Sequence, residues 1–441
     1  MDDSTATNSL IPTEGTVSED RHKLRILLGL SRSLGTEIVL DKLFAVIVAQ
    51  VTEAMSAERS SLFLYDEETR MLWSKVAEGV EQQEIRIPLG VGIAGAVAET
   101  LEPINIQNAY DDPRFNPSFD KKSGFRTRSI LTMPVVNQKG GLVGVVQVLN
   151  KKSFSCFDVE DEEFLTAMCA HIALAVDRAQ LVESYVKSQR MQESLAWARD
   201  IQTGILPKPF GANRAEIEVF ATMKTAQDVG GDLYDYCLID EDNLCFAIGD
   251  VSDKGVPAAL FMAMARTAFN ISARSGPKSI CDVLRTVNDF LVDNNDSQMF
   301  VTMFAGILNL KTGIVQYSDG GHEDPFFIRR GSKIEQFYKE NGLALGVMRG
   351  YEFACSSFQL MPGDSLILYT DGVNEAMNPQ RHMFSTPRIG ETLEPFVSGV
   401  PARDVATDLI SKVVEFANGA PQSDDITVLA IRYLGPNPAT A

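Results

Sequence analysis

One uninterrupted helical pattern constrains this chain more than any other feature. The pattern begins at Asp158 and continues to Ile205, and the first proline beyond its start is Pro207. Helices in globular domains typically span roughly 8–20 residues, so this one is far longer than usual. The chain has 441 residues, which is too long for one ordinary hydrophobic core. The sequence therefore predicts two folded regions joined by one long helix.

The distal part of this helix carries apolar residues at imperfect helical spacing. They are Leu181, Tyr185, Leu195, Ala198, Ile201 and Ile205. This spacing favours a coiled-coil seam of modest strength, and hence a homodimer. A monomeric connector packed on its own domain is the alternative. The segments that we predict are a disordered tail at 1–20, a first domain at 21–180, a helical linker at 181–208 and a second domain at 209–436.

Charge and hydropathy exclude several classes of partner. The formal net charge is −19, which repels phosphate backbones and anionic lipids and favours divalent cations. We therefore expect neither nucleic acid nor a membrane as a partner. No apolar run approaches the length of a membrane span, and the first 20 residues lack the basic start and apolar core of a signal peptide. The chain is predicted to be cytoplasmic.

The cysteines and histidines limit the metal chemistry. No CxxC pair occurs, so we expect neither a disulfide framework nor a thiolate zinc site, and we expect reduced thiols. The six cysteines are Cys156, Cys169, Cys237, Cys245, Cys281 and Cys355. Only four histidines occur, widely separated, so a metal site would be built mainly from oxygen ligands. Oxygen ligands point to magnesium or manganese.

The two halves differ in their local patterns. The first begins with an amphipathic stretch at 22–55, continues with alternating apolar segments, and has a long polar connection at 105–129, which we interpret as a lid over a ligand. The second half, after Pro209, has short β-type segments in hairpin order and two helices. We predict an α+β chain whose second domain packs two antiparallel sheets face to face between helical layers.

Aspartates recur at the ends of the predicted strands in the second half. They are Asp232, Asp250, Asp371, Asp424 and Asp425. A single Asp-Gly turn is explained by the preference of Asp and Gly for turns alone, but four such sites in order indicate that the aspartates act together in one site. Rigid strand ends hold carboxylates well for a hard cation, and clustered carboxylates repel one another unless cations neutralise them. The pattern predicts a metal site.

The motifs GGDLYD, GDVSDKGVPAALFMA, YSDGGH, GDSLILYTDGVNEA and SDDITV together resemble the SpoIIE/RsbU branch of the PPM (protein phosphatase 2C-type) serine/threonine phosphatases, over residues 200–435. The resemblance implies an α/β/β/α sandwich with two manganese or magnesium ions. It implies that Asp250 bridges both ions, that Asp371 and Asp424 complete the first, and that Asp232 and the carbonyl of Val251 hold the second. It also implies a phosphoserine or phosphothreonine protein substrate, of the STAS-domain (anti-anti-sigma) type.

The chain departs from this family at a few positions. Many relatives have Gly at the position of Asp253 and an Asn-Ala pair at the position of Asp319-Gly320. Arg266 and Arg381 are nearby candidates for a phosphate-clamping arginine. His322 is either a general acid or a structural hydrogen-bonding residue of a turn.

The first half resembles GAF domains of cyclic-nucleotide phosphodiesterases and adenylyl cyclases, over residues 22–180. The resemblance rests on EIRIPLGVGIAGAVAE, the polar connection and the NKFDE signature. The signature residues are Asn150, Lys151, Phe157, Asp161 and Glu162, which in the family stabilise the pocket through a lysine-aspartate pair. The residues that match nucleotide-lining positions are Ser61, Asp120, Ser123, Thr127 and Gln147. The implied ligand is cyclic AMP or cyclic GMP; another small molecule or a ligand-free dimerisation module are the alternatives.

The leading hypothesis is therefore a two-metal phosphatase regulated by ligand binding to a GAF domain and acting in bacterial partner switching. The competing hypothesis is a catalytically weak PPM scaffold whose GAF domain senses a cyclic nucleotide or only dimerises. Hydrolysis of cyclic nucleotides is disfavoured, because four dispersed histidines cannot supply the catalytic domain that such hydrolases use.

Overall fold

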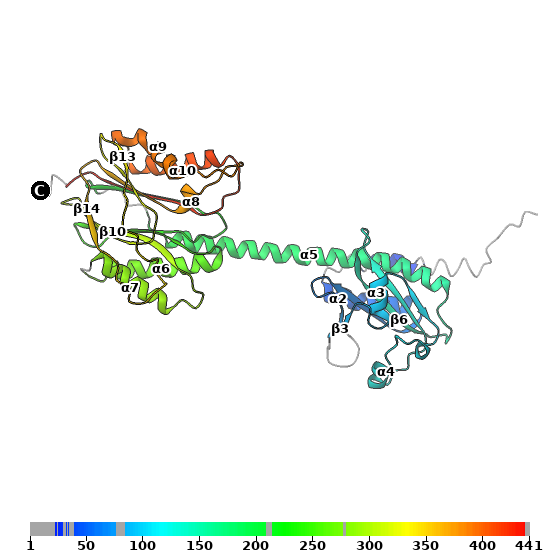
Figure 1. The fold of residues 1–441 in the computed structure, drawn as a ribbon. Helices are drawn as coiled ribbons and strands as arrows, with labels where there is room; N and C mark the ends of the chain where they lie inside the picture. Colours follow the sequence, from blue (N-terminus) through cyan, green and yellow to red (C-terminus); the bar gives the residue numbers. More distant parts are fainter. Residues whose placement is uncertain are drawn as a thin grey trace, which may run out of the picture. The chain divides into compact units, whose positions relative to one another are not determined.

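The computed structural model divides into two compact units, Met1–Arg190 and Met191–Ala441 (Figure 1). The division falls inside the helical linker predicted at 181–208. The tail predicted at 1–20 lies outside the described residues. The structure describes Lys23, Arg32, Leu34 and the ranges 25–29, 39–75, 84–208, 214–276 and 279–436.

The first unit is built on a six-stranded antiparallel sheet with the order β3-β2-β1-β6-β5-β4. The strands are β1 (Ala57–Asp66), β2 (Met71–Lys75), β3 (Glu84–Pro88), β4 (Ile104–Ile106), β5 (Ile130–Val136) and β6 (Leu142–Lys151). Side chains alternate along β1, as the pleat of a strand requires. Leu62 and Leu64 join one core cluster, and Phe63 between them joins another. The sheet is thus covered on both faces.

The helices of the first unit supply these two covers. On one face, α2 (Leu40–Ala54) and the start of α5 pack in the larger cluster through residues such as Ile47 and Leu165. On the other face, α3 (Gly92–Thr100) contributes Ala94 and Val97. The connection between β4 and β5 contains the short helices η1 (Ala109–Asp111) and α4 (Ser118–Ser123).

The long helix α5 (Val159–Ile205) is a single element of 47 residues, as the sequence predicts. Its first turns bury Leu165 and Met168 in the core of the first unit. Leu181 and Tyr185, in its middle part, are exposed. Gln202, near its end, is buried in the second unit. The coiled-coil dimer stays a prediction.

The second unit contains two five-stranded sheets. We call them the β9 sheet, with the order β14-β11-β10-β9-β8, and the β16 sheet, with the order β13-β12-β15-β16-β7. The strands are β7 (Ile217–Lys224), β8 (Leu233–Leu238), β9 (Asn243–Val251), β10 (Val301–Asn309), β11 (Ile314–Gly320), β12 (Phe326–Ile328), β13 (Ile334–Gln336), β14 (Ser356–Gln359), β15 (Ser365–Tyr369) and β16 (Ile426–Tyr433).

Three core clusters hold the layers of the second unit together. Phe246 and Phe304 of the β9 sheet and Leu366 and Leu429 of the β16 sheet belong to one cluster between the sheets. Helices α6 (Val256–Arg274) and α7 (Ile280–Asp293) cover the outer face of the β9 sheet. Helices α9 (Thr386–Leu393) and α10 (Ala402–Ala417) cover the outer face of the β16 sheet. The predicted α/β/β/α sandwich is confirmed.

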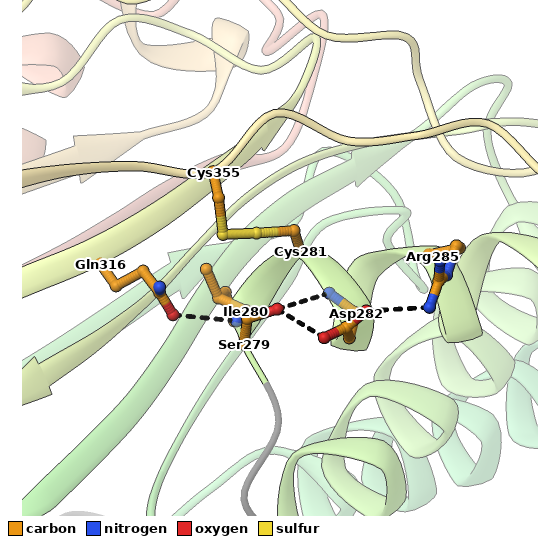
Figure 2. The surroundings of a disulfide bond; sticks show 7 residues. All are labelled: Ser279, Ile280, Cys281, Asp282, Arg285, Gln316 and Cys355. Carbon is orange, nitrogen blue, oxygen red and sulfur yellow. Dashed lines mark hydrogen bonds and ion pairs between the residues drawn. A yellow bond between two sulfur atoms is a disulfide. The ribbon is translucent and has the colours of Figure 1, made fainter.

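A disulfide corrects one prediction. Cys281 in the first turn of α7 is bonded to Cys355, which directly precedes β14 (Figure 2). Their Cα atoms lie 5.6 Å apart, within the usual range for a disulfide. The prediction that all six cysteines are reduced is therefore wrong for this pair. The two residues are 74 positions apart, so no local spacing signals a contact that only the packing of α7 against the sheet edge creates.

Two helices in the described part of the chain, α5 and α6, reach the length and hydropathy of a membrane span by composition alone. This differs from the prediction that no apolar run approaches that length. Helix α6 buries Phe261 and Met262 against the β9 sheet, and α5 buries Leu165 in the first unit. Core helices of soluble proteins pass the same test, so this is weak evidence for a membrane span.

Candidate active site at the edge of the paired sheets

Four aspartates lie where strands of the two sheets end. Asp232 directly precedes β8, and Asp250 is the second-last residue of β9. These strands are antiparallel neighbours, so their two carboxylates leave the β9 sheet side by side. Asp371 begins the short helix α8 (Asp371–Asn374) just after β15, and Asp424 lies just before β16. Because β15 and β16 are also antiparallel neighbours, the β16 sheet presents the second pair.

Asp232 connects the two sheets through hydrogen bonds. Its side chain is buried, and its Oδ2 accepts a hydrogen bond from Thr370 Oγ1 at 2.8 Å and one from Thr427 Oγ1 at 2.5 Å. Both threonines belong to the strand ends of the β16 sheet. The contact fixes the position of one carboxylate relative to the opposite sheet.

Burial and the neighbouring carboxylates raise the pKa values of three of these aspartates. Burial, followed by repulsion from Asp371 and Asp424, raises the pKa of Asp250 to about 7. Burial, followed by repulsion from Asp424 and Glu375, raises the pKa of Asp371 to about 6. Burial and the charge of Asp250 hold the pKa of Asp232 well above its usual range. Such mutual repulsion is what a bound cation would relieve.

The carboxylates are the right chemical type of ligand for a divalent ion, because oxygen donors on rigid strand ends suit Mg²⁺ or Mn²⁺. Asp371 Oδ1 is buried and lacks a hydrogen-bond partner. Asp424 Oδ2 is paired with the Nζ atom of Lys254 at 2.7 Å. Among the described residues, no three Asp, Glu, His or Cys side chains stand close enough to hold an ion together. Binding would therefore require these side chains to turn toward one another.

The neighbouring Asp425 accepts hydrogen bonds from the main chain. Its Oδ1 accepts a hydrogen bond from Ala226 N at 2.8 Å, and its Oδ2 accepts one from Gly231 N at 2.7 Å. Asp425 thus ties the segment before β8 to the start of β16. A Cβ atom on Gly372 would lie 1.9 Å from the Asp425 carbonyl oxygen, so only glycine fits beside Asp371.

The carbonyl of Val251 faces the segment that leads to Asp232. A Cβ atom on Gly231 would lie 3.2 Å from the Val251 carbonyl oxygen. The glycine therefore leaves space in front of this oxygen. The role of this carbonyl as a metal ligand stays a prediction.

Three further predicted residues lie in different surroundings. His322 is buried, and its Nδ1 is 3.0 Å from Thr302 Oγ1. Burial, followed by the charge of Lys339, lowers the pKa of His322 to about 3, which favours the structural role over that of a general acid. Arg266 is paired with Asp235, with Nε 3.2 Å from Oδ2. Arg381 is exposed in the turn that follows α8.

In the first unit, the predicted nucleotide-lining residues fall into two groups. Ser61 and Gln147 are opposite each other on β1 and β6, and Gln147 Nε2 donates to Thr132 Oγ1 at 3.1 Å. Asp120 lies in α4, where it accepts hydrogen bonds from Thr127 N at 2.7 Å and from Thr127 Oγ1 at 2.8 Å. The side chain of Ser123 lies outside the described part of the chain.

The NKFDE residues form a connected set. The ion pair of Lys151 Nζ with Asp161 Oδ2 measures 2.5 Å. Phe157 is buried in the core with α2 and α5. Asn150 Oδ1 accepts hydrogen bonds from the main chain that leads into β5, and Glu162 Oε1 accepts one from Asn105 Nδ2 at 2.7 Å. These contacts join the start of α5 and the end of β6 to β4 and to the main chain just before β5.

Comparison with known families assigns both units. The family model of stage II sporulation protein E (SpoIIE) matches residues 240–434, and the GAF domain model matches residues 39–176. The chain joins a GAF domain to a SpoIIE-type phosphatase domain.

Individual relatives agree with this assignment. Protein IcfG of Synechocystis sp. is 31% identical over 278 residues, which are 57% of this chain and 43% of IcfG. A cGMP-specific 3′,5′-cyclic phosphodiesterase of Drosophila erecta is 33% identical over 190 residues, 38% of this chain and 17% of that enzyme. The SiaA-PP2C domain of Pseudomonas aeruginosa has a TM-score of 0.50 at 21% identity, over 56% of this chain and 98% of that domain, which shows a shared fold. The chain spans less than half the length of these two curated relatives.

The departures of the phosphatase domain from its family have local explanations. Asp253 has a backbone φ of 69°, a left-handed conformation that glycine adopts more easily. Asp319 accepts hydrogen bonds from Gly321 N and Gly342 N, and its charge is compensated by Lys339, whose Nζ lies 3.1 Å away and whose side chain is fully buried. An aspartate is tolerated there because a buried lysine accompanies it.

Helix α5 contacts the segment that leads to Asp232. Gln202 Nε2 donates to the Gly230 carbonyl at 2.6 Å, and Gly230 N donates to Gln202 Oε1 at 3.1 Å. Arg199 Nη2 also pairs with Asp228 Oδ1 at 2.6 Å. The end of the connecting helix therefore holds the residues that lead to Asp232.

Sequence reasoning missed the residues that position the aspartates. Thr370, Thr427 and Gln202 act through partners far away in the sequence. Thr370, Thr427 and Lys254 all stand inside the quoted motifs, but the partner of Lys254, Asp424, is 170 positions away. No local pattern could have revealed these pairs.

Proposed function

We propose that the protein is a divalent-metal-dependent phosphatase that removes phosphate from phosphoserine or phosphothreonine in a partner protein. The observation that supports this most directly is the meeting of Asp232, Asp250, Asp371 and Asp424 at one edge of two sheets, where burial and mutual repulsion raise pKa values. Bound cations would relieve the repulsion among these carboxylates.

In this proposal Asp250 would hold both of two Mn²⁺ or Mg²⁺ ions, Asp371 and Asp424 would complete the first, and Asp232 with the Val251 carbonyl would hold the second. Such ions would supply an activated water for attack on phosphorus and would neutralise the phosphoryl oxygens. Neighbouring side chains orient the carboxylates. Thr370 and Thr427 hold Asp232 in place.

The proposed substrate is a STAS-domain phosphoprotein of a bacterial partner-switching system. The match to the SpoIIE family and the resemblance of the motifs to the SpoIIE/RsbU branch support this proposal. Both domains are of soluble types, and we propose that the protein works in the cytoplasm as a homodimer joined along α5. The exposed Leu181 and Tyr185 on α5 support that seam.

We further propose that a small molecule, cyclic AMP or cyclic GMP, binds the GAF domain at the sheet face of Ser61 and Gln147 and regulates the phosphatase. The bidentate contact of Gln202 with Gly230 supports a route, because any movement at the end of α5 would shift the segment that carries Asp232.

The test is phosphate release from phosphorylated candidate STAS proteins, with Mn²⁺ and with or without each cyclic nucleotide. We expect release that Asp250→Asn abolishes and that a nucleotide changes severalfold. Absence of release from every phosphoserine substrate would reject the catalytic part, and equal rates with and without nucleotide would reject that regulatory ligand.

A catalytically weak scaffold is the second candidate, and one observation favours it. No three potential ligands in the described residues already stand close enough to hold an ion. Calorimetric titration with Mn²⁺ separates the two, because a scaffold would take up manganese weakly or not at all.

A further inference from the structure

Lys254 is the residue of the site that neither the fold nor the proposed ligand set requires. It lies between the end of β9 and the start of α6, and its Nζ is 2.7 Å from Asp424 Oδ2. The same ammonium group also donates to the Ser423 carbonyl. Its side chain is 43% exposed, so it approaches the carboxylates from the solvent side.

No other cation in the described part of the chain forms an ion pair with any of the four aspartates, whereas Lys254 does so with Asp424. Two other basic residues of this domain are engaged elsewhere: Arg266 pairs with Asp235, and Lys339 pairs with Asp319. Lys254 is therefore the internal counter-ion of a strongly negative cluster.

The position of Lys254 also suits an anion. Gly255 is the N-cap of α6, a helix of 19 residues, so Lys254 stands at the positive end of that helix. A lysine ammonium is a compact charge on a flexible four-carbon stem, which allows it to move between neighbouring oxygen acceptors. A phosphate that reaches the four aspartates would meet this group at the solvent-exposed rim.

We propose that Lys254 is an exchangeable counter-ion, which neutralises Asp424 when the carboxylate has no divalent ion and contacts the substrate phosphate when Asp424 has become a ligand. The reason is competition, since Asp424 Oδ2 cannot serve the ammonium and a divalent ion equally well. The proposal rests on the proposed function, and it assigns a phosphate contact to Lys254.

The first experiment measures metal binding rather than activity. Mn²⁺ is titrated calorimetrically into the full-length protein and into Lys254→Gln, with Lys311→Gln as the matched control. Lys311 also pairs with an aspartate, Asp242, at 2.7 Å, but it is 62% exposed and remote in sequence from the four aspartates. We expect Lys254→Gln to bind Mn²⁺ about three- to tenfold more tightly. Lys311→Gln should match the unchanged protein.

The second experiment measures phosphate. The inhibition constant of inorganic phosphate against hydrolysis of a phosphoserine peptide should rise about tenfold in Lys254→Gln. Lys254→Arg keeps the charge, and its inhibition constant should stay within about threefold of the unchanged protein. Thermal unfolding checks that each variant is folded.

The possible outcomes distinguish a failure of the proposed function from a failure of the role proposed for Lys254. If the unchanged protein binds no Mn²⁺, the proposed function fails and takes this inference with it. If it binds Mn²⁺ but Lys254→Gln shows equal or weaker affinity, competition for Asp424 is overturned while the proposed function stands. If the phosphate inhibition constant is unaffected by Lys254→Gln, the contact with substrate is overturned.

Discussion

The polar residues of the GAF domain and those of the phosphatase edge are both largely buried, but their partners differ. In the GAF domain, Asp120 receives hydrogen bonds from Thr127 and from Tyr110 Oη, which lies 3.0 Å from its Oδ2. At the phosphatase edge, Asp250 has other carboxylates as its charged neighbours. The first arrangement stabilises the fold, whereas the second costs stability unless a cation neutralises the carboxylates.

The largest expected effect comes from Asp250→Asn. The substitution keeps the shape of the side chain but removes the charge that the proposed metal site needs, so phosphatase activity should fall by about 100-fold or more. In EDTA the same variant should unfold at a higher temperature than the unchanged protein, because repulsion from Asp371 and Asp424 is relieved. A lower unfolding temperature in EDTA would contradict the comparison. Asp242→Asn, at an exposed ion pair, is the control.

In the GAF domain, Asp120→Ala should lower stability, whereas Asp250→Asn should raise it in EDTA. The variant leaves Thr127 N and Thr127 Oγ1 without their acceptor, which should lower the unfolding free energy of this domain by about 1–3 kcal/mol. Hydrogen exchange of the segment between β4 and β5 would measure the loss. Asp111→Ala, exposed in the same segment, should change little. Equal protection in both variants would remove the distinction between the two regions.

The raised pKa of Asp250 also predicts how stability depends on pH. The pKa of Asp250 is raised to about 7 in the folded protein, against 3.8 for an ordinary aspartate, so the folded state retains a proton that the unfolded chain releases. In EDTA, stability should therefore be greatest below about pH 4, fall as the pH rises toward 7, and level off above it. Thermal unfolding between pH 5 and 8, in steps of about half a unit, tests this slope. A stability that rises with pH in EDTA would be inconsistent with repelling carboxylates.

The smallest effect is expected at Asp253. Its left-handed backbone, with a φ of 69°, suits glycine, so Asp253→Gly should stabilise the phosphatase domain by up to about 1 kcal/mol. The unfolding temperature reports the change, and Ser252→Gly, at the preceding residue, is the comparison. A loss of stability in Asp253→Gly alone would show that the aspartate side chain makes a contribution greater than its backbone cost.

The sequence predicted those features that depend on local patterns. The length of α5 follows from helical spacing without a proline, and the aspartates at strand ends follow from short apolar segments that stop at Asp-Gly turns. The layered order of the second unit follows from hairpin succession. These are properties of neighbouring residues, so one chain suffices to find them.

The remaining features depend on contacts between distant parts of the chain. The disulfide of Cys281 and Cys355 joins a helix to a sheet edge, and the pair of Lys254 with Asp424 joins two strand ends. Neither pair has a spacing rule, because the fold alone brings the partners together. The role of His322 was also open until its burial and its contact with Thr302 favoured a structural task.

The most direct test of the account is a count of manganese ions. Calorimetric titration of the full-length protein at neutral pH should show two Mn²⁺ per chain, and Asp250→Asn should lose both strong binding events. A protein that takes up no manganese, or whose uptake is unchanged by Asp250→Asn, would contradict the claim that the four aspartates exist to bind cations.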